Sequence, residues 1–149
     1  MLWTVLIILG VLIILALGIY AGKLLFMLKA QNDRQEAARQ TRIVRIKESI
    51  ITITMAMEQQ QCDLSEGAIR VVNLLDALPL KAPPAYDQQF PHIHNLFVAI
   101  SGFPILEARQ RLTKQERRKQ DREREQIESE HETRVLGELA AIRDFCNAL

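Results

Sequence analysis

The pattern of hydrophobic and polar residues changes along the chain, and its first part is almost purely apolar. From Leu2 to Gly22 there are 21 residues without a charge, and 13 of them are Leu, Ile or Val. A helix of this length measures about 32 Å, enough to cross a hydrocarbon core of about 30 Å. Trp3 and Tyr20 stand near its ends, where aromatic side chains anchor a helix at the membrane interfaces. We therefore predict a transmembrane helix over residues 1–22.

Two other interpretations of this apolar segment fit less well. A signal peptide has a basic start and an apolar core of about 7–15 residues, whereas here only Met1 precedes a longer apolar run. A helix that is apolar on every side could also lie inside a soluble core. The rest of the chain is too small and too polar to enclose such a helix.

The charges that follow the predicted span indicate its orientation. Nothing basic precedes the span except the terminal amine. Residues 23–42, in contrast, form a basic juxtamembrane helix with Lys23, Lys29 and Arg34 closest to the membrane. The positive-inside rule places this side in the cytoplasm and the N-terminus outside.

Beyond the basic stretch, residues 43–149 are predicted to form a cytoplasmic helical domain. Its first apolar residues recur at steps of three and four, which is the spacing of a heptad seam. They are Ile43, Ile46, Ile50, Ile53 and Met57. The seam predicts either one face of a helix packed inside its own domain or a coiled-coil interaction seam with a partner. Because the seam covers only two heptads, too few to establish a coiled coil, we favour the packed face. We expect one nearly continuous helix over residues 2–60.

The next part of the pattern predicts two shorter helices and a loop. An amphipathic helix is expected over residues 64–78, begun by a capping box of Asp63 and Glu66 and ended by a proline. Four of the five prolines fall in residues 79–91, which we expect to be a loop. A short apolar helix at 92–101 follows.

The last predicted element is one long charged helix over residues 104–147, with Pro104 in its first turn. Between residues 113 and 134 the only large aliphatic side chain is Ile127, and opposite charges recur four residues apart. An apolar face then returns, at Val135, Leu139, Ile142 and Cys146. We expect this face to pack on the helices of residues 43–78.

These elements together predict the fold class. No segment shows the period-two alternation of a strand. The chain is therefore expected to be all-α, with one N-terminal transmembrane helix followed by a small cytoplasmic antiparallel helical bundle that ends in a long charged helix.

Histidine and glutamate residues supply candidate metal ligands. His92 and His94 are two residues apart, so on a helix they point about 200° apart and would not share one ion. Glu128 and His131 match half of a di-iron bundle motif, but the chain has no second Glu-x-x-His. Phosphate-binding loops, nucleophile elbows and Cys-x-x-Cys pairs are also missing from the sequence. We predict no enzyme, cofactor or metal site, with a metal- or cofactor-dependent helical enzyme on these four residues as the alternative.

A basic cluster in helix 109–124 raises the possibility of binding to nucleic acid or lipid headgroups. It centres on Arg117, Arg118 and Lys119, but interleaved acidic residues cancel much of its charge. The net charge of +1 and the aromatic content of 5% argue against a nucleic-acid surface. A solvated, salt-bridged helix is the simpler interpretation, and nucleic-acid or headgroup binding is an alternative.

The order of these features is similar to that of a known family. The residues that carry the likeness are the N-terminal span, Phe103-Pro104, the run LTKQERRKQD at residues 112–121, and His131-Glu132. The chain resembles an uncharacterised bacterial family of small single-span membrane proteins, described as a domain of unknown function. The resemblance covers essentially the whole chain. It implies the bacterial inner (cytoplasmic) membrane and brings neither an activity nor catalytic residues.

An apolar anchor joined to amphipathic helices without a chemical motif predicts a non-enzymatic function. We expect a membrane-tethered helical interaction or adaptor module. Its partners would be the lipid bilayer and either another protein or a second copy of the chain.

Overall fold

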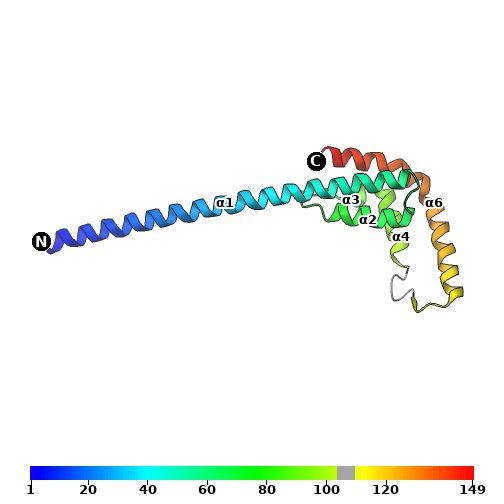
Figure 1. The fold of residues 1–149 in the computed structure, drawn as a ribbon, viewed down its shortest axis with the longest axis horizontal. Helices are drawn as coiled ribbons and strands as arrows, with labels where there is room; N and C mark the ends of the chain where they lie inside the picture. The colour runs from blue at the N-terminus through cyan, green and yellow to red at the C-terminus, as the bar shows by residue number, and fades with distance from the viewer. Residues whose placement is uncertain (104–109) are drawn as a thin grey trace. The chain divides into compact units, whose positions relative to one another are not determined.

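The structure, a computed structural model, describes residues 1–103 and 110–149. Every helix or strand within these residues is an α-helix, which confirms the all-α prediction (Figure 1). The helices are α1 (Leu2–Glu58), α2 (Leu64–Asp76), α3 (Tyr86–Gln89), α4 (Pro91–Ser101) and α6 (Lys114–Asn147). The chain divides into two compact units, residues 1–41 and residues 42–149.

The first unit is the N-terminal part of α1. No charged side chain occurs from Leu2 to Gly22, and the large apolar side chains of this stretch are more than half exposed. A contiguous apolar surface of this size is unfavourable in water. By length and composition α1 could cross a membrane, and the expected apolar N-terminal helix is confirmed.

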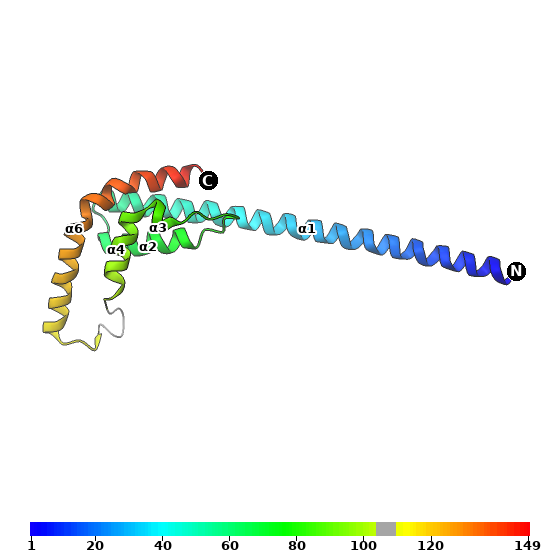
Figure 2. The same cartoon turned by 180° about the vertical axis from the view of Figure 1, so that it is seen from behind.

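The second unit has one hydrophobic core. The end of α1 contributes to this core together with α2, α4 and α6. Figures 1 and 2 show the C-terminal half of α6 beside the end of α1, and Arg143 of α6 forms an ion pair with Glu58 of α1 at 2.9 Å. The largest fully buried side chains are Phe90, Ile50, Leu75, Ile93, Leu96, Leu139 and Ile142.

The apolar face of α6 is buried as its spacing suggests, but its main neighbour was not predicted. Val135, Leu139, Ile142 and Cys146 are all fully buried. The helix packs on α2 and, more extensively, on α4. The expectation that residues 43–78 alone receive this face is therefore incomplete.

The contact between α6 and α4 includes a cap that one helix supplies to the other. The N-cap residue of α4, Phe90, offers no side-chain hydrogen bond to the first turn. The carboxylate of Glu138, which is only 8% exposed, instead accepts hydrogen bonds from the backbone N–H groups of His92 at 3.2 Å and Ile93 at 2.8 Å. A carboxylate at a helix N-terminus is stabilised by the free N–H groups and by the helix dipole. Glu138 therefore fixes α4 against α6.

The long C-terminal helix begins later than predicted. Leu112 and Thr113 lie outside the helix, and α6 starts at Lys114. Thr113 and Glu116 form a capping box, with the Glu116 carboxylate accepting from the Thr113 N–H at 2.8 Å and the Glu116 N–H donating to the Thr113 hydroxyl at 3.3 Å. An unbroken helix from residue 104 is therefore wrong, and Pro104 itself lies outside the described residues.

Two details around α2 and α4 also differ from the sequence prediction. Asp63 takes the N-cap position of α2, but its side chain makes no capping hydrogen bond, and Glu66 forms an ion pair with Arg70. The predicted capping box is therefore wrong. The expected loop at 79–91 contains α3, because the Tyr86 side chain is buried against the edge of the Phe145 ring at a centroid distance of 5.9 Å.

Candidate functional site

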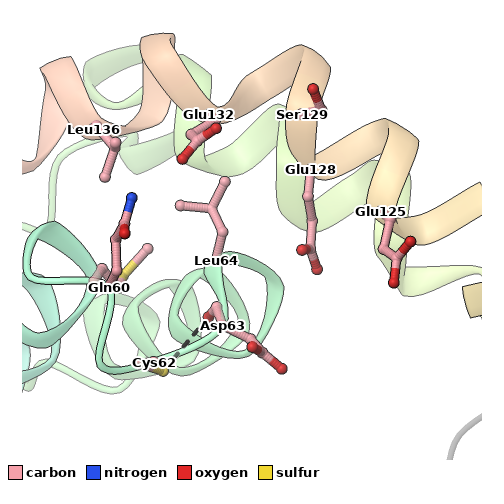
Figure 3. A pocket seen from close by; sticks show the side chains of 10 residues that line it. Gln60, Cys62, Asp63, Leu64, Glu125, Glu128, Ser129, Glu132 and Leu136 are labelled. Atoms are coloured by element: carbon pink, nitrogen blue, oxygen red, sulfur yellow. Dashed lines mark hydrogen bonds between the residues drawn. The ribbon is translucent and has the colours of Figure 1, made fainter. Parts of the chain in front are cut away.

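A pocket of about 310 Å³ lies where the turn between α1 and α2 faces α6. Gln60 in this turn has a φ of 55°, a left-handed conformation that helps the chain reverse direction. Figure 3 shows the pocket and the side chains around it. Its lining residues are Met57, Gln60, Cys62, Asp63, Leu64, Glu125, Glu128, Ser129, Glu132 and Leu136.

Three glutamates give the α6 side of the pocket its acidic character. Glu125, Glu128 and Glu132 are spaced at i, i+3 and i+7, which places them on one face of the helix. In Figure 3 the side chains of Glu125 and Glu128 point toward the α2 side, while Leu64 points from α2 toward α6. The pocket thus combines carboxylates with apolar side chains in one lining.

Glu128 is tied into the bundle on both sides. Its carboxylate accepts a hydrogen bond from the Ser65 hydroxyl of α2 and lies 3.6 Å from the Arg124 guanidinium one turn earlier in α6. These contacts hold one edge of the pocket in place. Glu125 and Glu132 are exposed, whereas Glu128 is half-buried. Glu125 and Glu132 are therefore more accessible than Glu128 to a group from another molecule.

The Cys62 thiol is poorly suited to act as a nucleophile. Burial raises its pKa, and the negative charge of Glu66 raises it further. The protonated thiol therefore dominates at neutral pH, and the reactive form of cysteine is the thiolate. The carboxylates of the pocket can attract cations and accept hydrogen bonds.

The structure distributes the histidines and Glu128 over separate places. Glu128 lines the acidic pocket, whereas His94 lines a different pocket formed by α2, α3 and α4. His92 lies two residues before His94 at the start of α4, and His131 lies on α6. Within residues 1–103 and 110–149, no three His, Cys, Asp or Glu side chains gather closely enough to hold a metal ion.

The residues of the predicted heptad seam lie inside the protein's own bundle. Ile43, Ile46, Ile50 and Met57 are buried in the core, and Ile53 is half-buried against it. This is the packing described by the in-domain alternative. The predicted anchor residues Trp3, Tyr20, Lys23 and Arg34 have exposed side chains on α1, and that of Lys29 is largely exposed.

Charged pairs cover part of the basic cluster in α6. Lys119 and Glu123 approach to 3.9 Å, and both side chains are at least half exposed. Arg124 pairs with Glu128 as its spacing predicts. Arg109, the first residue of the cluster, lies outside the described residues. Such exposed pairs contribute little to stability and are weakened by salt.

Several residues of interest were not singled out from the sequence. Glu125 and Glu132 were treated as part of a uniformly charged helix, although their spacing with Glu128 places three acids on one face. Glu138 interrupts an otherwise apolar stripe, which is a signal for a buried polar contact. Gly18 and Gly22 are four residues apart, the spacing of a small-xxx-small packing face in membrane helices.

Comparison with known proteins gives a family but no activity. An uncharacterized protein of Haemophilus influenzae is 32% identical over 139 residues, covering 93% of this chain and 91% of that protein. No solved structure matches the chain. Residues 14–142, which include most of α1 and the whole acidic pocket, match the family described as "Protein of unknown function (DUF2489)". The chain therefore belongs to this uncharacterised bacterial family.

Proposed function

We propose that this protein is a non-enzymatic, membrane-tethered helical module that holds a protein partner at the cytoplasmic face of the bacterial inner membrane. The observation that carries the proposal is that the two ends of α1 differ in burial. This single helix runs from Leu2 to Glu58, is apolar and exposed at its start, and is buried in a helical core at its end. A membrane anchor and a folded module thus share one helix without a linker.

The orientation rests on the charges that follow the apolar segment. Lys23, Lys29 and Arg34 are on its C-terminal side. Positively charged flanks stay on the cytoplasmic side. A C-terminal fluorescent reporter should therefore be active and a C-terminal periplasmic phosphatase inactive. The opposite pair of results would reverse the orientation.

The acidic pocket of Figure 3 is the surface we propose for the partner. Its rim carries Glu125 and Glu132, whose charges could meet basic or hydrogen-bond-donating groups. Its lining also offers Leu64 and Leu136 to an apolar side chain. Charged rims of this kind govern the rate and specificity of association more than its strength.

Site-specific crosslinking in intact membranes tests this proposal directly. A photo-reactive amino acid in place of Glu125 in the full-length protein should yield an adduct of defined mass. The same substitution at Asn95, an exposed position on α4, serves as the matched control and should yield none. Equal labelling from both positions, or none from either, would contradict the assignment of the surface.

Two further results would change the assignment of function. Turnover, or a tightly bound cofactor in the purified protein, would show an enzyme rather than an adaptor. A crosslink to a second copy would point to self-association. The face with Gly18 and Gly22 suits self-association, because small residues four positions apart let two membrane helices approach closely.

A further inference from the structure

A pocket of about 520 Å³ lies on one side of α1, just beyond the apolar segment that ends at Gly22. It is formed wholly within the first unit, residues 1–41, and shares no residue with the acidic pocket of Figure 3. Along the chain its lining changes from large apolar side chains to polar and cationic ones. The lining residues are Leu24, Phe26, Met27, Leu28, Ala30, Gln31 and Arg34.

The apolar surface of α1 continues past the predicted span and into this pocket. From Leu2 to Leu28 the only charged residue is Lys23, and the side chains of residues 24–28 are between 43% and 74% exposed. A helix of this length measures about 40 Å, against a hydrocarbon core of about 30 Å. Such a helix tilts or carries its apolar end into the headgroup region. With α1 as the membrane anchor of the proposed function, on which this inference rests, residues 24–28 lie where acyl chains meet headgroups.

The side chain of Arg34 brings a positive charge to this boundary. Arg34 is six residues beyond Leu28, about 9 Å along the helix axis, yet it lines the same pocket as Leu24. Its side chain therefore lies back along the helix toward the apolar end, as helical side chains generally do. Within residues 1–103 and 110–149 Arg34 forms no ion pair, whereas Glu36 on the same stretch is paired with Arg39 at 2.5 Å. The charge of Arg34 is thus available to an anion from another molecule.

The order of groups in the lining is that of a phospholipid. Acyl chains need apolar contacts, which Leu24, Met27 and Leu28 supply at the end nearer the membrane. A phosphate needs donors and a positive charge, which the Gln31 amide and the Arg34 guanidinium supply at the other end. No acidic residue is among the lining residues.

We propose that this pocket binds one anionic phospholipid. Its phosphate is held by Arg34 and Gln31, and an acyl chain lies along Leu24, Met27 and Leu28. A guanidinium and a phosphate form strong, charge-assisted hydrogen bonds. A zwitterionic lipid carries an ammonium that the arginine repels, so an anionic headgroup is preferred.

A second basic residue separates a site from general attraction by charge. Lys29 is closer to the apolar segment than Arg34, but it points about 140° around the helix from Arg34 and does not line the pocket. General attraction to an anionic surface falls off with distance, so it depends on Lys29 at least as much as on Arg34. Binding in the pocket depends on Arg34 alone of these two.

The direct test is fluorescence quenching of the full-length protein in lipid vesicles. Trp3 is the only tryptophan, so Trp3→Phe combined with Phe26→Trp places a single reporter in the pocket. The vesicles contain phosphatidylglycerol and phosphatidylcholine in equal amounts, with bromine on the acyl chains of one or the other. Brominated phosphatidylglycerol should quench more strongly, with a preference of about fivefold.

The other results of this test are distinguishable. Equal quenching by the two brominated lipids would overturn the lipid site and leave the membrane anchor intact. Absence of quenching by either lipid would overturn both, because the reporter would then be outside the bilayer.

Matched charge variants locate the binding. Arg34→Gln in the reporter protein should lower the preference to less than about twofold, because the positive charge at the phosphate is lost. Lys29→Gln removes the same charge from the other side of the helix and should leave the preference nearly unchanged. Both side chains are exposed, so the helix content should stay that of the reporter protein. An equal or larger loss with Lys29→Gln would show general attraction and refute the site.

A change of shape without a change of charge tests the pocket itself. Ala30 is half-buried in the lining, so Ala30→Leu should fill the space between the apolar end and Arg34 and lower the preference at least threefold. Ala37→Leu, at an exposed position outside the lining, is the control and should have no effect. An unchanged preference in Ala30→Leu would overturn the proposal, since attraction by Arg34 alone needs no pocket.

Discussion

At the scale of single residues, Glu138 makes a buried polar contact that joins α6 to the start of α4. It is a buried carboxylate that accepts hydrogen bonds from two backbone N–H groups at the start of α4. Hydrogen bonds to a charged group contribute about 1.5–3 kcal/mol. The chain places this charge inside the apolar stripe of α6, where an apolar residue would otherwise be expected. Glu138 is therefore a structural residue rather than part of the acidic pocket.

Replacing Glu138 with alanine should lower the free energy of unfolding by about 2–3 kcal/mol, because two buried N–H groups lose their acceptor. Glu138→Gln should cost roughly half as much, since the amide oxygen can still accept. Chemical denaturation of the full-length protein in detergent measures both. Glu132→Gln on the rim of the acidic pocket is the control and should stay within about 0.5 kcal/mol. An alanine variant as stable as the unmodified protein would show that the cap is not needed.

Cys146 gives a pH dependence with a defined sign. The thiol is fully buried, and burial raises its pKa from 9.0 to about 11. Between these values the unfolded chain has lost the proton and the folded protein retains it, so stability falls as the pH rises from about 9 to about 11. The loss is about 2–3 kcal/mol at 1.36 kcal/mol per pKa unit.

The Cys146 prediction is measured as a difference between two proteins. Unfolding curves of the unmodified protein and of Cys146→Ala are compared at pH 8 and pH 11. The alanine variant should be less stable at pH 8 because of the space it leaves, but it should lose less stability on the alkaline side. Parallel curves for the two proteins would mean that the thiol does not titrate in this range.

At the scale of elements, the start of α6 shows how much a short polar motif determines. Thr113 and Glu116 form reciprocal hydrogen bonds, and the hydrogen bonds from the Thr113 backbone and side chain lower the pKa of Glu116. Because residues 114–134 are largely exposed, packing contributes little to this end of the helix. Its stability depends on the cap and on ion pairs along the helix surface.

Replacing Thr113 with alanine should increase hydrogen exchange in the first turns of α6 about three- to tenfold, because a capping hydrogen bond is lost. The pKa of Glu116 should rise toward its ordinary value, as one of its two donors disappears. Exchange in the buried half of α6 should not change. Thr133→Ala, farther along the same helix, is the control, and equal effects of the two substitutions would rule out a specific cap.

The elements also show which features of the fold were predictable from sequence. Periodicity was sufficient for α1, α2 and α4 and for the buried face of α6, because burial follows the helical repeat. The start of α6 was missed even though Thr-x-x-Glu is present, because charged residues on both sides hid the break. The α3 turn depends on Tyr86 meeting Phe145, and this contact joins positions far apart in sequence. The acidic pocket depends on such contacts as well, and a single sequence does not specify them.

At the scale of the whole molecule, the two ends of α1 require different surroundings. The N-terminal end exposes a long apolar surface that water does not favour, whereas the C-terminal end is enclosed by the other helices of residues 42–149. Each of the 13 Leu, Ile and Val residues from Leu2 to Gly22 favours insertion by about 0.3–0.6 kcal/mol at most. Their sum, roughly 6 kcal/mol, is the free energy that would hold the protein in the membrane.

This sum predicts how many charges the anchor tolerates. An arginine at the centre of a membrane helix costs about 2.5–3.5 kcal/mol, so Leu12→Arg should weaken the anchor but leave the protein in the membrane. Adding Leu15→Arg should bring the free energy of membrane insertion near zero. Much of the protein should then appear in the soluble fraction after alkaline extraction. Leu25→Arg, beside Lys23 and beyond the predicted span, is the matched control and should have no effect. Retention of the double variant would show that contacts other than the apolar helix hold the protein. Release by Leu12→Arg alone would show that the apolar helix contributes less than half of the estimated free energy.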